Sequence, residues 1–402
     1  MKKINIVSIV TCLLCILLAY EWHVNVEKKN NEEKTVTVGI ILDGDESTPY
    51  NNNFLRAVPM IEAEYGDRVK VIPIRNIHLD HEHEALDELV EAGCDIIFTT
   101  SYGYGNMAKV YAGRYPDIVF CEATCDNANT DPVYPNYHTF MGRIYEGRYI
   151  SGVVAGYKLE QMIAEGEISA DEAIIGYVAA YSTPEIISGY TAFFLGVRSV
   201  VPSARMKVCY TDTWSDYTLE KSSTEKLIEE GCVIISQHSD TIGPAIACEE
   251  ASEDHPVYHV GYNQSMLDVA PTAALVSCRI NWIPYMIDTV GAVLEDKKIE
   301  DYVDAAYWGN DMCAGFDKDW VQMIELNEIS AAPGTQQKIE ELEEEFKRGS
   351  VHVFKGDYIG VNPDDPSDTW DLNNEYIENR SQSAPSFHYI LNDAIEIIEI
   401  SD

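Results

Sequence analysis

The sequence predicts an α/β protein with two Rossmann-like lobes that face each other across a cleft. From Thr35 onward, apolar runs rich in β-formers alternate with amphipathic helical segments, which is typical of parallel sheets covered by helices on both faces. The alternation then recurs. LDELVEAGCDIIFTTS at 86–101 and TEKLIEEGCVIISQHS at 224–239 each consist of a helix, a Gly-Cys turn and a buried strand that ends in Ser. Two lobes of the same build are therefore expected.

The first lobe is expected to begin with four strands and three helices in alternation. The strands are VTVGIIL, RVKVIPI, DIIFTTS and IVFCEAT, and the helices are NFLRAVPMIEAEYG, HEALDELVEAG and MAKVYAGRYP. Gly93 and Gly231 suit the left-handed position that ends a helix before its strand. YHTFMGRIYEGRYISGVVAGYKL contains a helix with small, close-packing residues, and this helix is expected to carry the first crossover between the lobes.

The remaining segments complete the predicted domain plan. AALVSCRI indicates a strand, WIPYMIDTVGAVLEDK a helix, and 333–349 a charged surface helix. Residues 361–384 lack periodicity and indicate a long exposed loop. The expected boundaries are residues 36–139 plus 264–305 for the first lobe, and 140–263 plus 306–402 for the second lobe with a C-terminal extension.

The N-terminus predicts a location outside the cytoplasm. Residues 1–20 have two lysines before an apolar run, which is typical of a secretory signal or a membrane anchor. Cys12 and Cys15 lack the small preceding residues of a clean lipoprotein signal, which favours an uncleaved anchor or a degenerate lipid signal. Residues 21–35 are polar and suit a tether. The protein is thus expected to be held at the cell membrane by its N-terminal segment.

The composition and the motifs exclude several functional classes. A formal net charge of −39 opposes binding to nucleic acid, because the chain repels phosphates. The loop after DIIFTTS has no third glycine and no GK[ST] ending, so it does not suit phosphate. No nucleophile elbow or triad spacing supports an enzyme. HLDHEHE at 78–84 could bind zinc, but Asp80 suits a helix N-cap and the other residues suit a solvated first turn, which is the favoured interpretation. Neither a metal nor another cofactor is therefore expected.

The cysteines beyond the N-terminal segment are expected to be residues of the core. Eight cysteines follow residue 20 and suit small core positions, while a disulfide between Cys121 and Cys125 remains an alternative.

In open α/β sheets, ligands bind beyond the carboxyl ends of the strands, so 101–105 and 238–243 should lie on opposite walls of the cleft. Aromatic rings among polar side chains suit a flat, uncharged ligand such as a purine or nucleoside, with core packing as the alternative for each ring. The candidate ligand-binding residues are Tyr50, Asn51, Ser101, Tyr102, Tyr181, Trp214, Asp216, His238, Asp240, Tyr262 and Trp282.

Long segments of the chain resemble the basic membrane protein (BMP) family, the purine-nucleoside-receptor-like solute-binding proteins of ABC transporters. The resemblance covers roughly residues 36–360. It rests on DIIFTTSYGYGNMAKVYAGRYPDIVF, FMGRIYEGRYISGVVAG, IIGYVAAYSTPEIISGYTAFFLGVRSVVPSARMKV, TWSD, EEGCVIISQHSD, HVGYNQSMLDVAPTAALVSCRINWIPYMIDTVGAVL and AAYWGNDMCAG. It implies a type I periplasmic-binding-protein fold with a hinged cleft, and a purine base or nucleoside as the ligand.

The resemblance also implies roles for single residues and a mechanism. Tyr50 and Asn51 match the aromatic-Asn pair after the first strand, Ser101 and Tyr102 match the cleft loop, and Trp282 matches the Trp of one branch. GYNQ and SCRI stand where the nucleoside-binding branch has an acidic residue for the ribose and a Lys, so a free base is a rival ligand. The implied mechanism is binding without chemistry, in which ligand contacts to both walls favour a closed form that docks on an ABC permease. A ligand-sensing ectodomain of a signalling system would use the same cleft.

Overall fold

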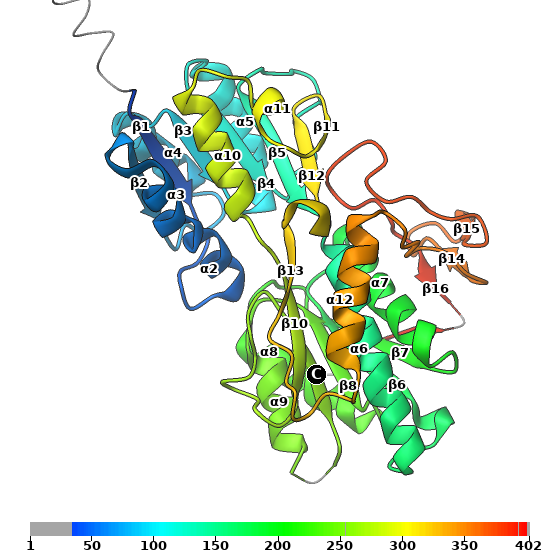
Figure 1. The fold of residues 1–402 in the computed structure, drawn as a ribbon. Helices are drawn as coiled ribbons and strands as arrows, with labels where there is room; N and C mark the ends of the chain where they lie inside the picture. Colours follow the sequence, from blue (N-terminus) through cyan, green and yellow to red (C-terminus); the bar gives the residue numbers. More distant parts are fainter. Residues whose placement is uncertain (1–33, 254, 393, 400–402) are drawn as a thin grey trace, which may run out of the picture.

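The computed structural model describes residues 34–253, 255–392 and 394–399, and these residues form two lobes that each contain a seven-stranded sheet (Figure 1). The alternation of strands and helices predicted from the sequence is confirmed. The inner parallel strands of both sheets are almost wholly buried, as expected for sheets covered on both faces, while the edge strands are partly exposed.

The first lobe has the strand order β11-β12-β5-β4-β3-β1-β2, in which only the β11–β12 pair is antiparallel. Its strands are β1 (Val36–Ile41), β2 (Val69–Ile74), β3 (Ile96–Thr99), β4 (Val119–Ala123), β5 (Tyr137–Gly142), β11 (Ala306–Trp308) and β12 (Asp311–Ala314). Its α-helices are α2 (Pro49–Leu55), α3 (Ala57–Tyr65), α4 (Glu82–Glu91), α5 (Gly105–Arg114), α10 (Ile283–Leu294) and α11 (Ile299–Tyr302).

The second lobe has the order β13-β10-β9-β8-β6-β7-β17, in which only the β10–β13 pair is antiparallel. Its strands are β6 (Ile174–Ala179), β7 (Arg205–Tyr210), β8 (Ile234–His238), β9 (Tyr258–Tyr262), β10 (Ala274–Ile280), β13 (Val321–Ile324) and β17 (Ile395–Ile398). Its α-helices are α6 (Ile144–Glu165), α7 (Pro184–Val200), α8 (Tyr217–Glu229), α9 (Gly243–Ala251) and α12 (Thr335–Lys347).

The connections between the lobes run close together. The chain crosses from β5 to α6, from β10 to α10, and from β12 to β13. Backbone hydrogen bonds join these connections, from Arg143 N to Ala314 O at 2.8 Å and from Asn281 N to Trp320 O at 2.8 Å. Such a bundle of short connections is the usual construction of a hinge between two lobes.

Helix α6 confirms the predicted crossover, and its small residues allow it to pack tightly on α7. A Cβ atom on Gly152 would overlap the carbonyl oxygen of Phe193, and a Cβ atom on Gly196 would overlap that of Tyr149. The two helix backbones therefore touch. This fixes α7, whose first turn faces the cleft, against the helix that enters from the hinge.

Sheet membership differs at two segments from the boundaries expected above. Strand β10 lies in the segment 264–305 but pairs in parallel with β9 of the second sheet. Strands β11 and β12 lie in 306–402 but pair with β5 of the first sheet. The chain thus completes a strand of the second lobe before it returns to the first. No local pattern in the sequence indicates such a return, because strand pairing is a long-range contact.

Residues 361–384 are not the continuous exposed loop expected from their lack of periodicity. A third sheet of order β15-β14-β16 uses β14 (Ile359–Val361), β15 (Thr369–Asp371) and β16 (Ile390–Leu391). The side chains of Glu378, Asn379 and Ser383 are buried. Strands of two or three residues are too short to leave a periodic signal.

The structure also bears on the cysteines and on the expected membrane anchor. The eight cysteines from Cys94 to Cys313 are buried and free, so Cys121 and Cys125 form no disulfide. Among the described residues, no helix has both the length and the apolar character needed to span a bilayer. The predicted anchor at 1–20 and nearly all of the tether at 21–35 lie outside the described residues.

Candidate functional site

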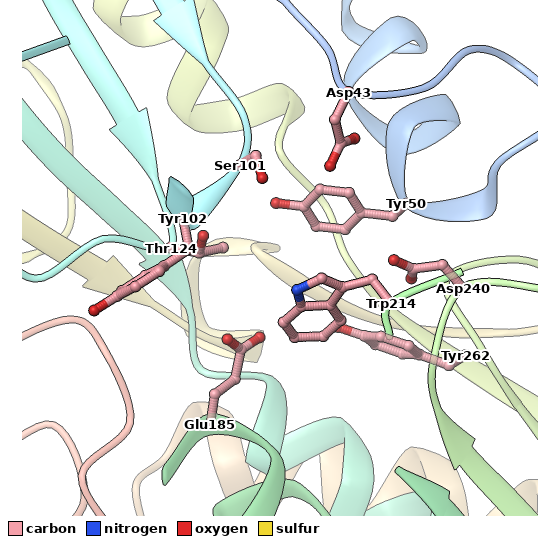
Figure 2. Close-up of a pocket in the computed structure, with 9 residues that line it drawn as sticks. All are labelled: Asp43, Tyr50, Ser101, Tyr102, Thr124, Glu185, Trp214, Asp240 and Tyr262. Atoms are coloured by element: carbon pink, nitrogen blue, oxygen red, sulfur yellow. The ribbon is translucent and has the colours of Figure 1, made fainter. Parts of the chain in front are cut away.

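A pocket lies between the lobes, beyond the carboxyl ends of strands from both sheets (Figure 2). Its empty volume is about 420 Å³, including open space at its mouth. Side chains from the first lobe meet side chains from the second. The lining residues are Asp43, Tyr50, Ser101, Tyr102, Thr124, Glu185, Trp214, Asp240 and Tyr262.

The first lobe holds the ring of Tyr50 in a fixed position. The Tyr50 hydroxyl donates a hydrogen bond of 2.6 Å to the carbonyl oxygen of Thr100, at the end of β3. The ring meets the ring of Phe54 edge-on at 5.3 Å and that of Trp282 at 6.4 Å. Burial raises the pKa of Tyr50 well above its usual value, with Asp43 adding to the effect. Tyr50 therefore offers the pocket an aromatic surface whose hydroxyl is already occupied.

Two further residues of the first lobe follow the ends of strands. Ser101 follows β3, and Thr124 follows β4 with a φ of 67°. A positive φ is rare for a β-branched residue, and such strain concentrates at ligand sites. Tyr102 borders the pocket but is 58% exposed, and its ring points away from the centre in Figure 2.

The second lobe supplies the facing aromatic surface. The Trp214 ring packs edge-on against Tyr181 at 5.5 Å, and the Tyr262 ring packs edge-on against His238 at 4.8 Å. Figure 2 shows Tyr50 on one side of the pocket and Trp214 and Tyr262 on the other. A flat ligand between them would contact aromatic rings from both lobes.

Three carboxyl groups line the pocket, and no Lys or Arg is among the described residues that do so. Burial raises the pKa of Asp240 well above its usual value, and the neighbouring Asp43, Glu220 and Glu185 add to this effect. Burial raises the pKa of Glu185 to about 7, with Arg148 opposing the rise. Asp240 thus favours its neutral form, and Glu185 changes its charge near neutral pH.

A buried layer of polar side chains lies behind Tyr262. The guanidinium group of Arg148 lies 3.8 Å from the centre of the Tyr262 ring and 5.8 Å from that of Tyr177. Arg148 is fully buried, and its nitrogens have no hydrogen-bond partner among the described residues. Burial and Arg148 together lower the pKa of His238 well below its usual value. This layer places one positive charge behind the acidic pocket.

A hydrogen-bonded chain joins the lobes beside the pocket. The Asn53 amide on α2 donates to Oδ1 of Asn263 at 3.2 Å, and the Asn263 amide donates to Oδ1 of Asp240 at 3.4 Å. Asn53 and Asn263 are buried, and Asn263 has a φ of 66°. The lobes are therefore in direct polar contact, and Asp240 belongs both to the pocket and to this contact.

The structure brings six of the eleven candidate residues to the pocket and places the other five around it. The six are Tyr50, Ser101, Tyr102, Trp214, Asp240 and Tyr262. The expected placement of 101–105 and 238–243 on opposite walls is confirmed by Ser101 and Asp240.

The other five candidates occupy the layer behind the pocket or a helix end. Tyr181 and His238 support pocket rings, as described above. Trp282 is buried and stacks on Phe54 at 4.5 Å, behind Tyr50. Asn51 is buried beside Gly44, and its side-chain oxygen has no partner among the described residues. Asp216 accepts a hydrogen bond from Leu219 N and caps α8.

Three pocket residues were missed by the sequence reasoning. Asp43 lies just after the end of β1, and Glu185 lies in the first turn of α7. A carboxyl group is ordinary at either position, so the sequence does not distinguish these two from solvated side chains. Thr124 follows the strand IVFCEA and carries no distinguishing signal, because its backbone conformation cannot be read from the sequence. Within the described residues, no group of three or more metal-ligating side chains gathers at HLDHEHE or elsewhere.

Comparisons with known proteins agree with the architecture. The family model for PnrA-like ABC transporter substrate-binding proteins matches residues 35–354. A purine-binding protein of Brucella abortus is 29% identical over 329 residues, covering 81% of this chain and 84% of that protein. A Haloferax volcanii protein, named as a candidate ABC transporter glucose-binding protein, is 33% identical over 249 residues, covering 62% of this chain and 56% of that protein.

Solved structures give the same fold. An ABC transporter solute-binding protein from Aeropyrum pernix has a TM-score of 0.63 at 16% identity, covering 83% of this chain and 95% of its own. A solute-binding protein from Conexibacter woesei has a TM-score of 0.61 at 15% identity, covering 79% and 98%. These likenesses establish the two-lobed fold of binding proteins for this chain.

Proposed function

Because the chain belongs to the PnrA-like family of ABC transporter substrate-binding proteins, we propose that it captures a purine base or nucleoside in the cleft between its lobes. The protein is an extracytoplasmic solute-binding protein and not an enzyme, and a permease receives its small-molecule ligand. The observation that carries the purine proposal is the pocket in which Tyr50 faces Trp214 and Tyr262 among three carboxyl groups.

Aromatic rings on both walls favour a flat ligand. A heterocycle placed between Tyr50 and Trp214 would bury both of its faces, and each favourable ring pair contributes about 0.5–1.5 kcal/mol beyond the buried area. The contacts would come from both lobes. Ligand binding would therefore stabilise the form in which the lobes are close, since a ligand shifts an equilibrium toward the state that it binds better.

The carboxyl groups favour a ligand that donates hydrogen bonds and oppose one that carries phosphate. Asp43, Glu185 and Asp240 offer acceptor oxygens to ring N–H groups, exocyclic amines or ribose hydroxyls. A nucleotide would place its phosphate beside these groups with no Lys or Arg in the described lining, and burying a charged phosphate without an opposite charge is unfavourable. The preferred ligand is therefore a base or nucleoside and not a nucleotide.

A sugar is the second candidate ligand. Sugar hydroxyls would also donate to the three carboxyl groups, and the Haloferax volcanii relative is named for glucose binding. The purine proposal is preferred because the Brucella abortus relative, named for purine binding, matches a larger share of both chains. The transporter family disfavours the alternative role as a sensor in a signalling system.

The membrane anchor also belongs to this proposal. The apolar run in residues 1–20, with its two preceding lysines, would hold the binding lobes at the outer face of the cell membrane. Whether the attachment is a signal anchor or a lipid, it would keep the protein close to its permease. Fractionation of cells that express the full chain, with and without a salt wash, would test this attachment.

A thermal-shift screen tests the ligand. The full chain would be heated with adenine, guanine, hypoxanthine, their nucleosides, adenosine monophosphate and glucose. A ligand present at a hundred times its Kd stabilises the folded protein by about 2.7 kcal/mol, which raises Tm measurably. We expect a shift with a base or nucleoside and none with the nucleotide. A shift with glucose alone would overturn the purine proposal and leave the binding fold intact.

A further inference from the structure

The C-terminal part of the chain, residues 355–399, lies beyond the segment that matches the family model. It is attached to the second lobe, because β17 pairs in parallel with β7 at the edge of that sheet. The short sheet β15-β14-β16 precedes β17 and lies beside the second lobe in Figure 1. Between β15 and β16, residues 378–387 leave this sheet and contact both lobes. We call them the bridge segment.

The first contact of the bridge segment is to the second lobe. Glu378 accepts a hydrogen bond of 3.0 Å from the hydroxyl of Ser188, in a buried position. Ser188 lies on α7, one turn after the pocket residue Glu185. The Glu378 carboxyl also accepts hydrogen bonds from the backbone of Ser386 and Phe387, so it holds both ends of the bridge segment together.

The second contact is to the first lobe. The backbone N–H of Ser383 donates a hydrogen bond of 2.6 Å to Oδ2 of Asp311, the first residue of β12. The other carboxylate oxygen of Asp311 accepts a hydrogen bond of 2.8 Å from Thr139 on β5. Asp311 and Ser383 are 3% and 1% exposed. This is a buried contact, because water reaches neither partner.

The bridge segment between these contacts is closed on itself. The amide of Asn379 donates to the carbonyl oxygens of Gln382 and Ser383, at 3.2 and 2.6 Å, and Asn379 has a φ of 51°. A turn held in this way cannot lengthen without losing its own hydrogen bonds. Movement of Ser188 away from Asp311 must therefore break a hydrogen bond at one end of the bridge segment or within it.

We propose that the bridge segment positions the two walls of the cleft and favours the closed arrangement of the lobes. Opening about the hinge would separate α7 of the second lobe from β12 of the first, and the bridge segment spans these two elements. Its residues do not line the pocket, so they act through the position of α7, and hence of Glu185, relative to the first lobe. The proposal rests on the two-lobed fold and on no particular ligand.

The distance between the lobes tests this proposal without any ligand. Spin labels would be attached to cysteines introduced by Ala63→Cys and Thr218→Cys, which are exposed helical positions on different lobes. The native cysteines in the described residues are buried, and Cys12→Ser and Cys15→Ser would remove the two thiols of the N-terminal segment. Pulsed electron resonance on the full chain in detergent would then give the distribution of lobe separations, with circular dichroism melts to confirm that each variant is folded.

Two variants weaken one contact each, and one variant is a matched control. Asp311→Asn replaces one of the two acceptor oxygens with an amide nitrogen. The remaining oxygen can accept a hydrogen bond from Thr139 or from Ser383. Ser188→Ala removes the donor to Glu378. The control is Asp365→Asn, which makes the same change at an exposed Asp outside the bridge segment that accepts a hydrogen bond from the backbone of Ser367.

We expect Asp311→Asn and Ser188→Ala to shift the distribution toward longer distances, with about a tenfold rise in the ratio of open to closed molecules, as expected for loss of a hydrogen bond to a carboxylate. Asp365→Asn should leave the distribution unchanged. Distributions that match the wild type in both folded variants would overturn the proposal. If one variant fails to fold, the other decides. A shift that Asp365→Asn shares would also count against the proposal.

Discussion

Glu185 lies in the wall of the cleft, and its raised pKa makes the free energy of unfolding depend on pH. Its side chain is 20% exposed, and burial raises its pKa from 4.5 to about 7, with Arg148 opposing the rise. The folded protein therefore keeps a proton that the unfolded chain releases. The stabilisation from this group is complete below pH 4.5 and is lost as the pH rises through about 7. The difference between the two pKa values corresponds to about 3 kcal/mol.

The variant Glu185→Gln isolates this effect, because the amide does not titrate. Urea unfolding of the ligand-free protein at pH 5 and pH 8 would give the free energy of unfolding for wild type and variant. We expect the wild type to lose about 2.5 kcal/mol more than the variant between these pH values, because part of the effect is already lost at pH 5. Glu88→Gln, which changes an exposed Glu on α4, should behave as the wild type. If Glu185→Gln shows the same pH dependence as the wild type, the reasoning from burial is wrong.

Three further variants test the site and the fold. Trp214→Ala should lower the affinity for a purine by about tenfold in calorimetry, since stacking on an aromatic ring contributes about 1–3 kcal/mol per base; Trp370→Ala, outside the cleft, should not. Asn53→Ala removes a hydrogen bond between the lobes and should speed ligand dissociation in stopped flow by about fivefold. Gly152→Ala forces a methyl group against Phe193 O and should reduce the free energy of unfolding by about 3 kcal/mol in urea.

Much of the fold was predictable because its signal is local. Buried parallel strands give continuous apolar runs and their helices give a periodic pattern, so β3 and β8 could be recognised with the helices before them. The rule that ligands bind at the carboxyl ends of strands then brought Ser101 and Asp240 to one pocket. The sheet membership of β10 and β12 could not be predicted, because it depends on pairing between segments far apart in the chain.

The details of the site were less predictable for the same reason. Trp282 has the residue type of a ligand-binding ring, yet its neighbours Phe54 and Tyr50 place it in the layer behind the pocket. Glu185 follows Pro184 at the start of α7 and has the residue type of a helix-terminal carboxyl. Its role as a pocket wall arises only because α7 points at the cleft. The type of a side chain limits what it can bind, while the packing of its helix decides whether it reaches a ligand.

Arg148 shows how the pocket can carry three carboxyl groups without a basic residue in its described lining. A positive charge in the lining would attract phosphate and would compete with the ligand for the carboxyl oxygens. Behind Tyr262, the same charge cannot touch a ligand, yet it still opposes the rise in the pKa of Glu185. The Tyr262 ring gives the guanidinium group of Arg148 a cation–π contact in place of a hydrogen bond. Such a contact is stronger where water is excluded. The pocket can therefore present acceptors to a neutral ligand while part of its negative charge is balanced from behind.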